Sequence, residues 1–318
     1  MINHYRKKEK KQMNNLKSCI TDYLEYCRCQ KRLDAKTLKA YRIDLKQFTE
    51  AVSGSSVDSV TPDILEKFIS KLHQTYKPKT VKRKIASLKA FFHYMEYRDI
   101  INMNPFNKIQ IKFREPVILP KTIPLHIIEK FLSTLYSQYK MTENMFRKKC
   151  ILRDIAVIEL LFATGMRISE LCSLKPEDIN LHDGIILIYG KGSKERKIQI
   201  GNKDVSNALK KYQTAYTDEI KACGYFFVNR LKHRFSEQSV REMIKKYCQI
   251  ALIDLHITPH MFRHSFATCL LEADVDIRYI QEMLGHSSIN ITQIYTHVAM
   301  SKQKDILTTK HPRKNFKI

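Results

Sequence analysis

Three closely spaced prolines, Pro116, Pro120 and Pro124, divide the chain into two parts that fold separately. Proline fixes its own φ angle, lacks an amide hydrogen and disfavours helix in the residue before it, so no helix continues through this segment. A chain of 318 residues is long enough for two domains with separate cores. The predicted parts are a basic stub at residues 1–15, a helical domain at 16–115, a Pro-rich linker at 116–124 and a second domain with a C-terminal tail at 125–318.

Apolar residues in the first of these domains recur at helical spacing. Between Leu38 and Phe48 they are three or four residues apart, which is typical of one face of an amphipathic helix. Another helix is predicted after Thr61 and Pro62, a capping residue followed by proline at the first helical position. A third helix is predicted from Thr80.

The second domain combines helical patterns with a predicted β-hairpin. The hairpin turn is Gly190-Lys191-Gly192-Ser193, between two short strand-like segments. The predicted elements are helices at Leu125–Tyr139 and Leu152–Ala163, strands at Ile185–Tyr189 and Arg196–Ile200, and further helices from about Ser236. The predicted fold class is therefore mainly α, with an all-helical domain followed by a mixed α/β domain that contains a small antiparallel sheet.

The charge of the chain indicates a polyanionic partner. Its 56 Lys and Arg against 32 Asp and Glu give a net charge of +24, which is typical of proteins that bind nucleic acid or an anionic membrane. The longest apolar stretches, Ile155–Ala163 and Ile185–Tyr189, are far shorter than the ~20 residues that span a bilayer. The basic segment Arg6–Lys11 is followed by polar residues, unlike a signal peptide. We expect a cytoplasmic, nucleoid-associated protein that binds no membrane.

Basic residues are densest in the first part of the chain. Residues 1–115 contain 25 basic and 12 acidic residues. Lys82, Arg83 and Lys89 lie opposite the apolar side of the third predicted helix. Such a charged side is usually only solvated, but the local excess favours a surface that grips DNA.

The eight cysteines indicate reduced thiols rather than disulfides or a metal centre. Most stand singly in apolar or helical stretches. Cys27 and Cys29 have one residue between them, and no second Cys or His pair has zinc-finger spacing. We expect neither a metal ion nor another cofactor.

The segment TGMRISEL contains a candidate phosphate ligand, Arg167. Gly165 is expected to end the preceding helix, and Glu170 follows Arg167 by three residues, so the two side chains can meet. Taken alone, this segment is best interpreted as an ordinary surface ion pair. The functional alternative is a guanidinium that holds two phosphate oxygens while Glu170 orients it.

Lys191 lies at the glycine-flanked tip of the predicted hairpin. Glycine, not Ser or Thr, follows it, and five residues separate Gly184 from Gly190, so the pattern is no Walker A loop. Taken alone, a plain basic turn is the simpler interpretation. A lysine here can also reach DNA or protonate a leaving hydroxyl.

His260 and Arg263 lie at a predicted helix start set by Thr258 and the proline that follows it. A helix N-terminus attracts anions, so the pair can serve a phosphate; two exposed polar residues are the simpler alternative. His256, His260 and His264 also have a spacing compatible with zinc, but an acidic partner is missing and Arg263 would repel the cation.

A tyrosine near the carboxyl end completes the candidate set. Tyr295 follows His286 by nine residues, and Gly285 is expected to end a helix just before that histidine. A lone tyrosine usually fills an amphipathic surface. Its place after a histidine at a helix break makes Tyr295 a candidate nucleophile.

These residues occur in the order and spacing of one known family. The chain resembles the tyrosine recombinases, also called the phage integrase family. The sequence segments that contain the six candidate residues are most similar to the Xer branch. These segments are TGMRISEL, GKGSKER, TPHMFRHSFAT and LGHSSINITQIYTH. Residues 16–114 resemble the helical, SAM-like core-binding domain of this family. The basic stub is longer than in many Xer-like proteins, and the arm-binding domain of large phage integrases is absent from this sequence.

The resemblance implies a covalent mechanism on double-stranded DNA. Tyr295 would attack the scissile phosphate, forming a 3′-phosphotyrosyl link and freeing a 5′-hydroxyl. Arg167 and Arg263 would hold the non-bridging oxygens, with Glu170 behind Arg167. Because the covalent link conserves the energy of the phosphodiester, neither ATP nor a metal ion would be required.

The remaining residues have supporting roles by the same resemblance. His260 would take the phenolic proton, Lys191 would protonate the leaving oxygen, and His286 would hydrogen-bond to the phosphate. A homo- or hetero-tetramer would act on paired sites, with the tail after Tyr295 docked into a neighbouring subunit. The alternatives are a type IB topoisomerase and a catalytically inactive, DNA-binding relative. The target sequence, the partner recombinase, and the choice between chromosome dimer resolution and mobile-element transfer stay open.

Overall fold

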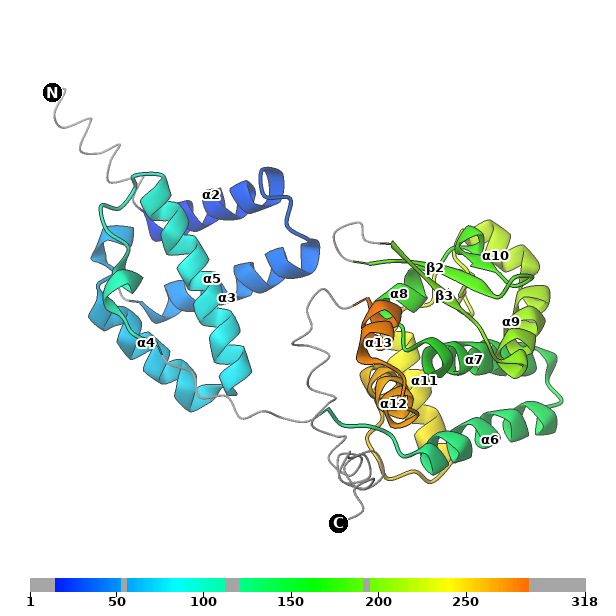
Figure 1. Cartoon of the computed structure of the whole chain (residues 1–318). Coiled ribbons are helices and arrows are strands. Elements are labelled where there is room, and N and C mark those ends of the chain that lie inside the picture. Colours follow the sequence, from blue (N-terminus) through cyan, green and yellow to red (C-terminus); the bar gives the residue numbers. More distant parts are fainter. Residues whose placement is uncertain (1–14, 53–55, 112–119, 191–194, 286–318) are drawn as a thin grey trace, which may run out of the picture. The chain divides into compact units, whose positions relative to one another are not determined.

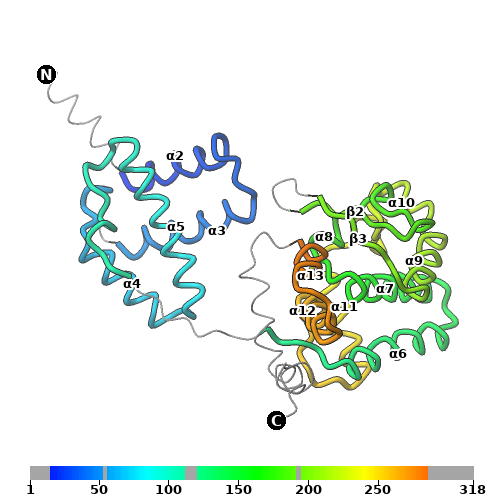
Figure 2. Tube along the Cα trace, in the orientation of Figure 1, coloured from blue at the N-terminus to red at the C-terminus, as the bar shows by residue number. Residues whose placement is uncertain are grey.

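The computed structural model describes residues 15–52, 56–111, 120–190 and 195–285. The chain forms two compact units, residues 1–117 and residues 118–318 (Figures 1 and 2). The division between them falls inside the segment predicted as a linker; the finer boundaries stay predictions.

In its described residues, the N-terminal unit contains four α-helices. They are α2 (Leu16–Cys29), α3 (Ala35–Ala51), α4 (Pro62–Thr75) and α5 (Pro78–Tyr97), with short 3-10 turns η1 (Val57–Ser59) and η2 (Pro105–Lys108). The side chains of Asn15, Asp34 and Thr61 cap α2, α3 and α4 by accepting backbone N–H groups. Helix α5 begins at Pro78, before the predicted Thr80, because proline lacks only an N–H that has no helical partner in the first turn.

The N-terminal core is aromatic, with one buried carboxylate among the helices. Phe91 packs edge-on against Tyr23 and Phe92, and all three are fully buried. Asp44 of α3 accepts hydrogen bonds from Lys84 Nζ at 3.0 Å and Ser87 Oγ at 2.8 Å, both from α5. Its negative charge is therefore balanced within the core.

The C-terminal unit is mainly helical and contains a three-stranded antiparallel sheet in the order β1-β2-β3. Its helices are α6 (Leu125–Met141), α7 (Met145–Thr164), α8 (Ile168–Ser173), α9 (Lys203–Ala215), α10 (Thr217–Cys223), α11 (Glu237–Ile250), α12 (Pro259–Glu272) and α13 (Ile277–Leu284), with the 3-10 turn η3 (Pro176–Asp178). The strands are β1 (Ile179–Asn180), β2 (Ile185–Tyr189) and β3 (Glu195–Gln199), and Ile186 pairs with Ile198.

The mainly α fold with a small antiparallel sheet is confirmed, but the expectation that helices resume only near Ser236 was wrong. Helices α9 and α10 precede that residue. Asn202 caps α9 by accepting the N–H groups of Asp204 and Val205, a signal that was readable in the sequence.

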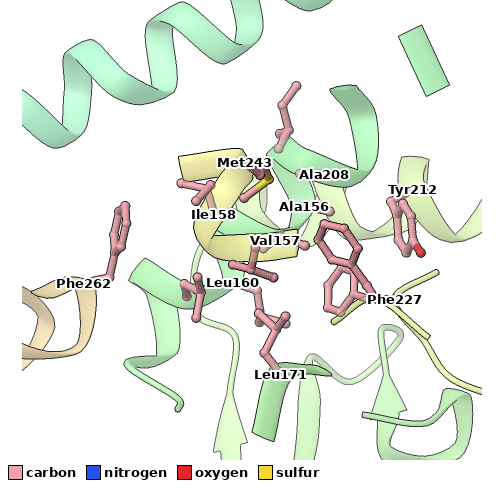
Figure 3. Close-up of a cluster of buried hydrophobic side chains, with 14 of the residues drawn as sticks. Ala156, Val157, Ile158, Leu160, Leu171, Ala208, Tyr212, Phe227, Met243 and Phe262 are labelled. Atoms are coloured by element: carbon pink, nitrogen blue, oxygen red, sulfur yellow. The ribbon is translucent and has the colours of Figure 1, made fainter. Parts of the chain in front are cut away.

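Helix α7 is the centre of the C-terminal core. From Ile151 to Leu161 its residues are buried on all sides, and it contacts α6, α9 and α12. Figure 3 shows Phe262 of α12 on one side of this cluster and Tyr212 and Phe227 on the other. A helix buried all round is expected at the centre of a unit of this size, and it fixes the neighbouring helices that carry the candidate site.

Gly165 ends α7 in the left-handed conformation, with φ of 57°. A Cβ built there would lie 2.6 Å from Phe266 Cδ1 and 3.0 Å from Leu284 Cδ2. The turn that leads into α8 therefore packs directly against α12 and α13, and this close approach needs a glycine.

We predict that Gly165→Ala destabilises the C-terminal unit by roughly 2–4 kcal/mol, from backbone strain plus overpacking. Gly224→Ala is the matched control: Gly224 ends α10 with φ of 72°, and a Cβ there would meet nothing within 4 Å. The control should cost about 1 kcal/mol. Urea unfolding of both variants measures the difference, and equal losses would contradict the packing explanation.

Candidate active site

Arg167 precedes α8 as its N-cap residue and is held by Glu170 in two ways. The backbone N–H of Arg167 donates to Glu170 Oε2 at 2.8 Å, and its Nη1 donates to Oε1 at 2.8 Å. The Arg167 side chain is 35% exposed, whereas that of Glu170 is 6% exposed. Because the carboxylate is buried and fixed, this contact differs from an ordinary surface ion pair. The guanidinium is oriented and still reaches solvent.

Arg196 of β3 is a further member of this cluster that sequence reasoning missed. Its Nη2 donates to Glu170 Oε2 at 2.7 Å and its Nη1 to Oε1 at 3.1 Å, a two-point contact. Its Nε donates to the carbonyl of Met283 in α13 at 2.9 Å. The available signal was an arginine in the GKGSKER segment, next to the predicted turn.

Arg263 is a buried guanidinium that joins the ends of two helices. Its Nη1 donates to the carbonyl of Gly165 at 2.8 Å, and its Nη2 donates to that of Leu284 at 2.7 Å. These carbonyls lie at the C-terminal ends of α7 and α13, where the helix dipoles are negative. The arginine therefore holds the turn before Arg167 against the end of α13.

His260 lies in the first turn of α12, on the exposed side, as predicted from Thr258 and Pro259. Partial desolvation, followed by the positive charges of Arg263 and Arg167, lowers its pKa below the ordinary value. The three side chains are thus close enough to interact electrostatically. A lowered pKa keeps the His260 imidazole neutral at pH 7, the form that can accept a proton.

Ser265 fixes α12 to the chain segment that enters the C-terminal unit. Its Oγ accepts from the N–H of Ile123 at 2.7 Å and donates to the Ile123 carbonyl at 3.2 Å. The helix carrying His260 and Arg263 is therefore anchored at both its Gly165 and its Ile123 contacts.

Of the predicted catalytic residues, the described part of the chain brings together Arg167, His260 and Arg263. Lys191, His286 and Tyr295 lie outside the described residues, as do the stub before Asn15 and the tail after Gly285. Their roles stay predictions. Within the described ranges no three His, Cys, Asp or Glu side chains gather to hold a metal ion, and the histidines of the zinc alternative are among those residues.

The three basic residues predicted to bind DNA are all exposed on α5. Arg83 forms an ion pair with the buried Asp44, so part of its charge is used within the unit. Lys89 Nζ lies 5.8 Å from the centre of the Phe106 ring. Lys82 and Lys89, seven residues apart, share one side of the helix.

The phage integrase family matches residues 130–302, and the N-terminal SAM-like domain of phage integrases matches residues 20–98. The chain therefore belongs to the phage integrase family, the tyrosine recombinases.

Within the described residues, no helix combines the length and apolar character needed to cross a membrane.

Individual relatives agree with this assignment. A tyrosine recombinase of Agathobacter rectalis is 66% identical over 304 residues, covering 96% of this chain and 99% of that protein. Tyrosine recombinase XerD of Listeria monocytogenes is 36% identical over 311 residues, covering 95% of this chain and all of that protein. The similarity to the Xer branch is confirmed.

Two solved structures share the architecture. The crystal structure of XerA recombinase is 26% identical, with a TM-score of 0.52 over 94% of this chain and 99% of that one. XerH recombinase in a post-cleavage complex with a palindromic difH substrate is 23% identical, with a TM-score of 0.71 over 91% of this chain and 83% of that one. At this level of identity, the likeness to XerH shows the fold.

Acid should destabilise the C-terminal unit through His264, which follows the site residues on α12. Desolvation and the charges of His260 and Arg263 lower the pKa of His264 to about 4. In the unfolded chain His264 takes up a proton near pH 6.5, whereas in the folded chain it does so only near pH 4. The free energy of unfolding therefore falls as pH decreases across this window. We predict that His264→Gln reduces the difference in unfolding free energy between pH 7 and pH 4.5 by on the order of 2 kcal/mol.

Chemical denaturation at both pH values measures this difference. His256→Gln is the control, because His256 is an exposed histidine of the same unit. An unchanged pH dependence in His264→Gln would be incompatible with a partly buried His264 that is neutral in the folded protein.

Proposed function

We propose that this chain is a site-specific recombinase that cuts and rejoins double-stranded DNA through a 3′-phosphotyrosyl link to Tyr295. One observation carries the proposal. Arg263 donates to the carbonyl of Gly165, which is 98 residues earlier in the chain, and so holds the Arg167 turn and the His260 helix together. Two guanidiniums can stabilise the charge that builds on a phosphodiester during in-line attack, and a neutral imidazole can accept the proton of the nucleophile.

The two arginines would stabilise the phosphorus as charge builds on its oxygens. Arg167 is partly exposed and fixed by Glu170, so it can meet an incoming phosphate without reorganising. Arg263 would add a second positive charge, and its orientation is set by hydrogen bonds to two carbonyls. Because positive charge on the phosphate comes from these side chains, we propose a reaction independent of metal ions and of ATP.

The proton transfers would use the remaining residues. The phenol of Tyr295 has an unperturbed pKa near ~10, so a base must take its proton at neutral pH. His260 is suited to this step because its lowered pKa leaves it neutral. Lys191 would protonate the leaving 5′-oxygen, and His286 would donate a hydrogen bond to the phosphate.

We expect Tyr295→Phe to abolish covalent capture of DNA while leaving DNA affinity within about threefold, since only the nucleophilic oxygen is lost. The measurement is adduct formation on a nicked suicide substrate, resolved on a denaturing gel. Tyr279→Phe is the matched control, because Tyr279 is an exposed tyrosine of α13. That variant should form adducts at the wild-type rate.

Two outcomes would redirect the proposal. If the wild-type protein binds DNA without forming an adduct, the chain is a DNA-binding relative without catalytic activity. If it forms an adduct and relaxes supercoils on a single site, without pairing two sites, the topoisomerase alternative is correct. Recombination between two sites supports the recombinase and the proposed tetramer, in which the tail after Tyr295 docks into a neighbour.

The basic side of α5 would contribute affinity without sequence specificity. We predict that Lys82→Ala and Lys89→Ala each weaken DNA binding and each lower the slope of log K against log salt by about 1, because each lysine neutralises one phosphate. Lys67→Ala, an exposed lysine on α4, is the control and should leave the slope unchanged. Fluorescence anisotropy across a salt series gives the slopes. Unchanged slopes for both α5 variants would mean that Lys82 and Lys89 do not contact DNA phosphates.

A further inference from the structure

We propose that Arg196 is a positioning residue for strand cleavage: by neutralising Glu170, it leaves the charge of Arg167 available to the scissile phosphate. The proposal rests on the function given above. In this proposal Arg196 acts through the carboxylate that orients Arg167.

The geometry places one carboxylate between two guanidiniums. Glu170 accepts two hydrogen bonds from Arg196 and one from the side chain of Arg167. The side chain of Arg196 is 10% exposed, whereas that of Arg167 is 35% exposed. The inner arginine therefore has the two-point contact, and the outer arginine has the single contact and the access to solvent.

The charges of this group decide what Arg167 can do. Burial by itself raises the pKa of Glu170, but the hydrogen bonds from Arg196 and Arg167 outweigh it and hold that pKa below its ordinary value. The carboxylate is thus ionised, and two arginines against one carboxylate leave one net positive charge. Without Arg196, Glu170 and Arg167 would form a closed, neutral pair, and the developing charge on the phosphate would gain less from Arg167.

A third contact fixes Arg196 itself. Its Nε bonds to the carbonyl of Met283, near the C-terminal end of α13, where a cation is favoured. Gly285, which ends α13, leaves space for the Arg196 guanidinium, because a Cβ on Gly285 would lie 2.9 Å from Arg196 Nη1. The guanidinium is consequently held on both sides, and lysine, which lacks the planar fork, can replace its charge but not all of its bonds.

Arg234 is a matched control arginine, because its side chain contacts the same short helix, α8. Arg234 Nε donates to the carbonyl of Cys172 at 2.6 Å, and its Nη2 donates to Ser173 Oγ at 2.8 Å. It therefore supports α8 at the opposite end from Arg167, through Cys172 and Ser173 rather than through Glu170. If Arg196 only stabilised α8, removing Arg234 would have a similar effect.

The test compares full-length variants on a nicked suicide substrate at saturating DNA. Arg196→Gln should slow covalent adduct formation about 10- to 100-fold, the usual effect of losing a group that orients a functional ligand, with the Kd for DNA within threefold. Arg196→Lys should be intermediate, and Arg234→Gln should be within threefold of wild type. A rate for Arg196→Gln equal to that of Arg234→Gln, or a loss confined to the Kd, would overturn the proposal.

A double-mutant cycle separates positioning from general support. In a Glu170→Gln background there is no carboxylate to neutralise, so Arg196→Gln should slow the reaction less than threefold further. An undiminished effect there would mean that Arg196 acts through Met283 instead, and the proposal would be wrong. Should Arg196→Gln fail to fold, Arg196→Lys decides: a reduced rate at unchanged Tm supports the role, and a wild-type rate refutes it.

The failure of this inference is distinct from that of the proposed function. If wild-type protein forms no adduct, both are lost. If wild-type protein forms the adduct and the Arg196 variants keep its rate, only the role of Arg196 is lost.

Discussion

The buried guanidinium of Arg263 is the interaction on which the rest of the site depends. It binds the last carbonyls of α7 and α13, so two helix C-termini that carry partial negative charge are drawn to one cation. The turn leading to Arg167 is fixed by one of these bonds, and the end of α13 by the other. Arg196 binds the carbonyl of Met283, one residue before that end, so the two arginines hold consecutive carbonyls of α13.

Much of the site could be predicted because its signals are local. Gly165 was expected to end α7, and Thr258 to start α12, since glycine caps and proline-assisted starts depend on neighbouring residues only. The role of Arg196 could not be read in this way. Its contact with Glu170 joins residues 26 apart through the placement of β3, which is set by tertiary packing and carries no signature in the local sequence. Helices α9 and α10 were missed because their many polar residues obscure a short apolar side.

The basic residues of α5 lie in two kinds of environment that the sequence alone does not distinguish. Arg83 and Lys84 are adjacent basic residues of α5, and both form ion pairs with Asp44. The Lys84 side chain is buried, whereas that of Arg83 is exposed. Net charge therefore overstates the charge that this unit offers to DNA. Lys82 and Lys89 of the same helix are exposed, whereas Lys84 is buried.

The two carbonyl bonds of Arg263 also have an entropic consequence. A free arginine side chain loses roughly 2 kcal/mol of rotamer freedom when it is immobilised. Here that ordering happens when the helices pack, before any DNA arrives, so the encounter with substrate has one fewer long side chain to arrange. The orientation of this cation is thus already set in the folded protein, and the enthalpy and entropy of DNA association should reflect chiefly the more exposed side chains, such as Arg167.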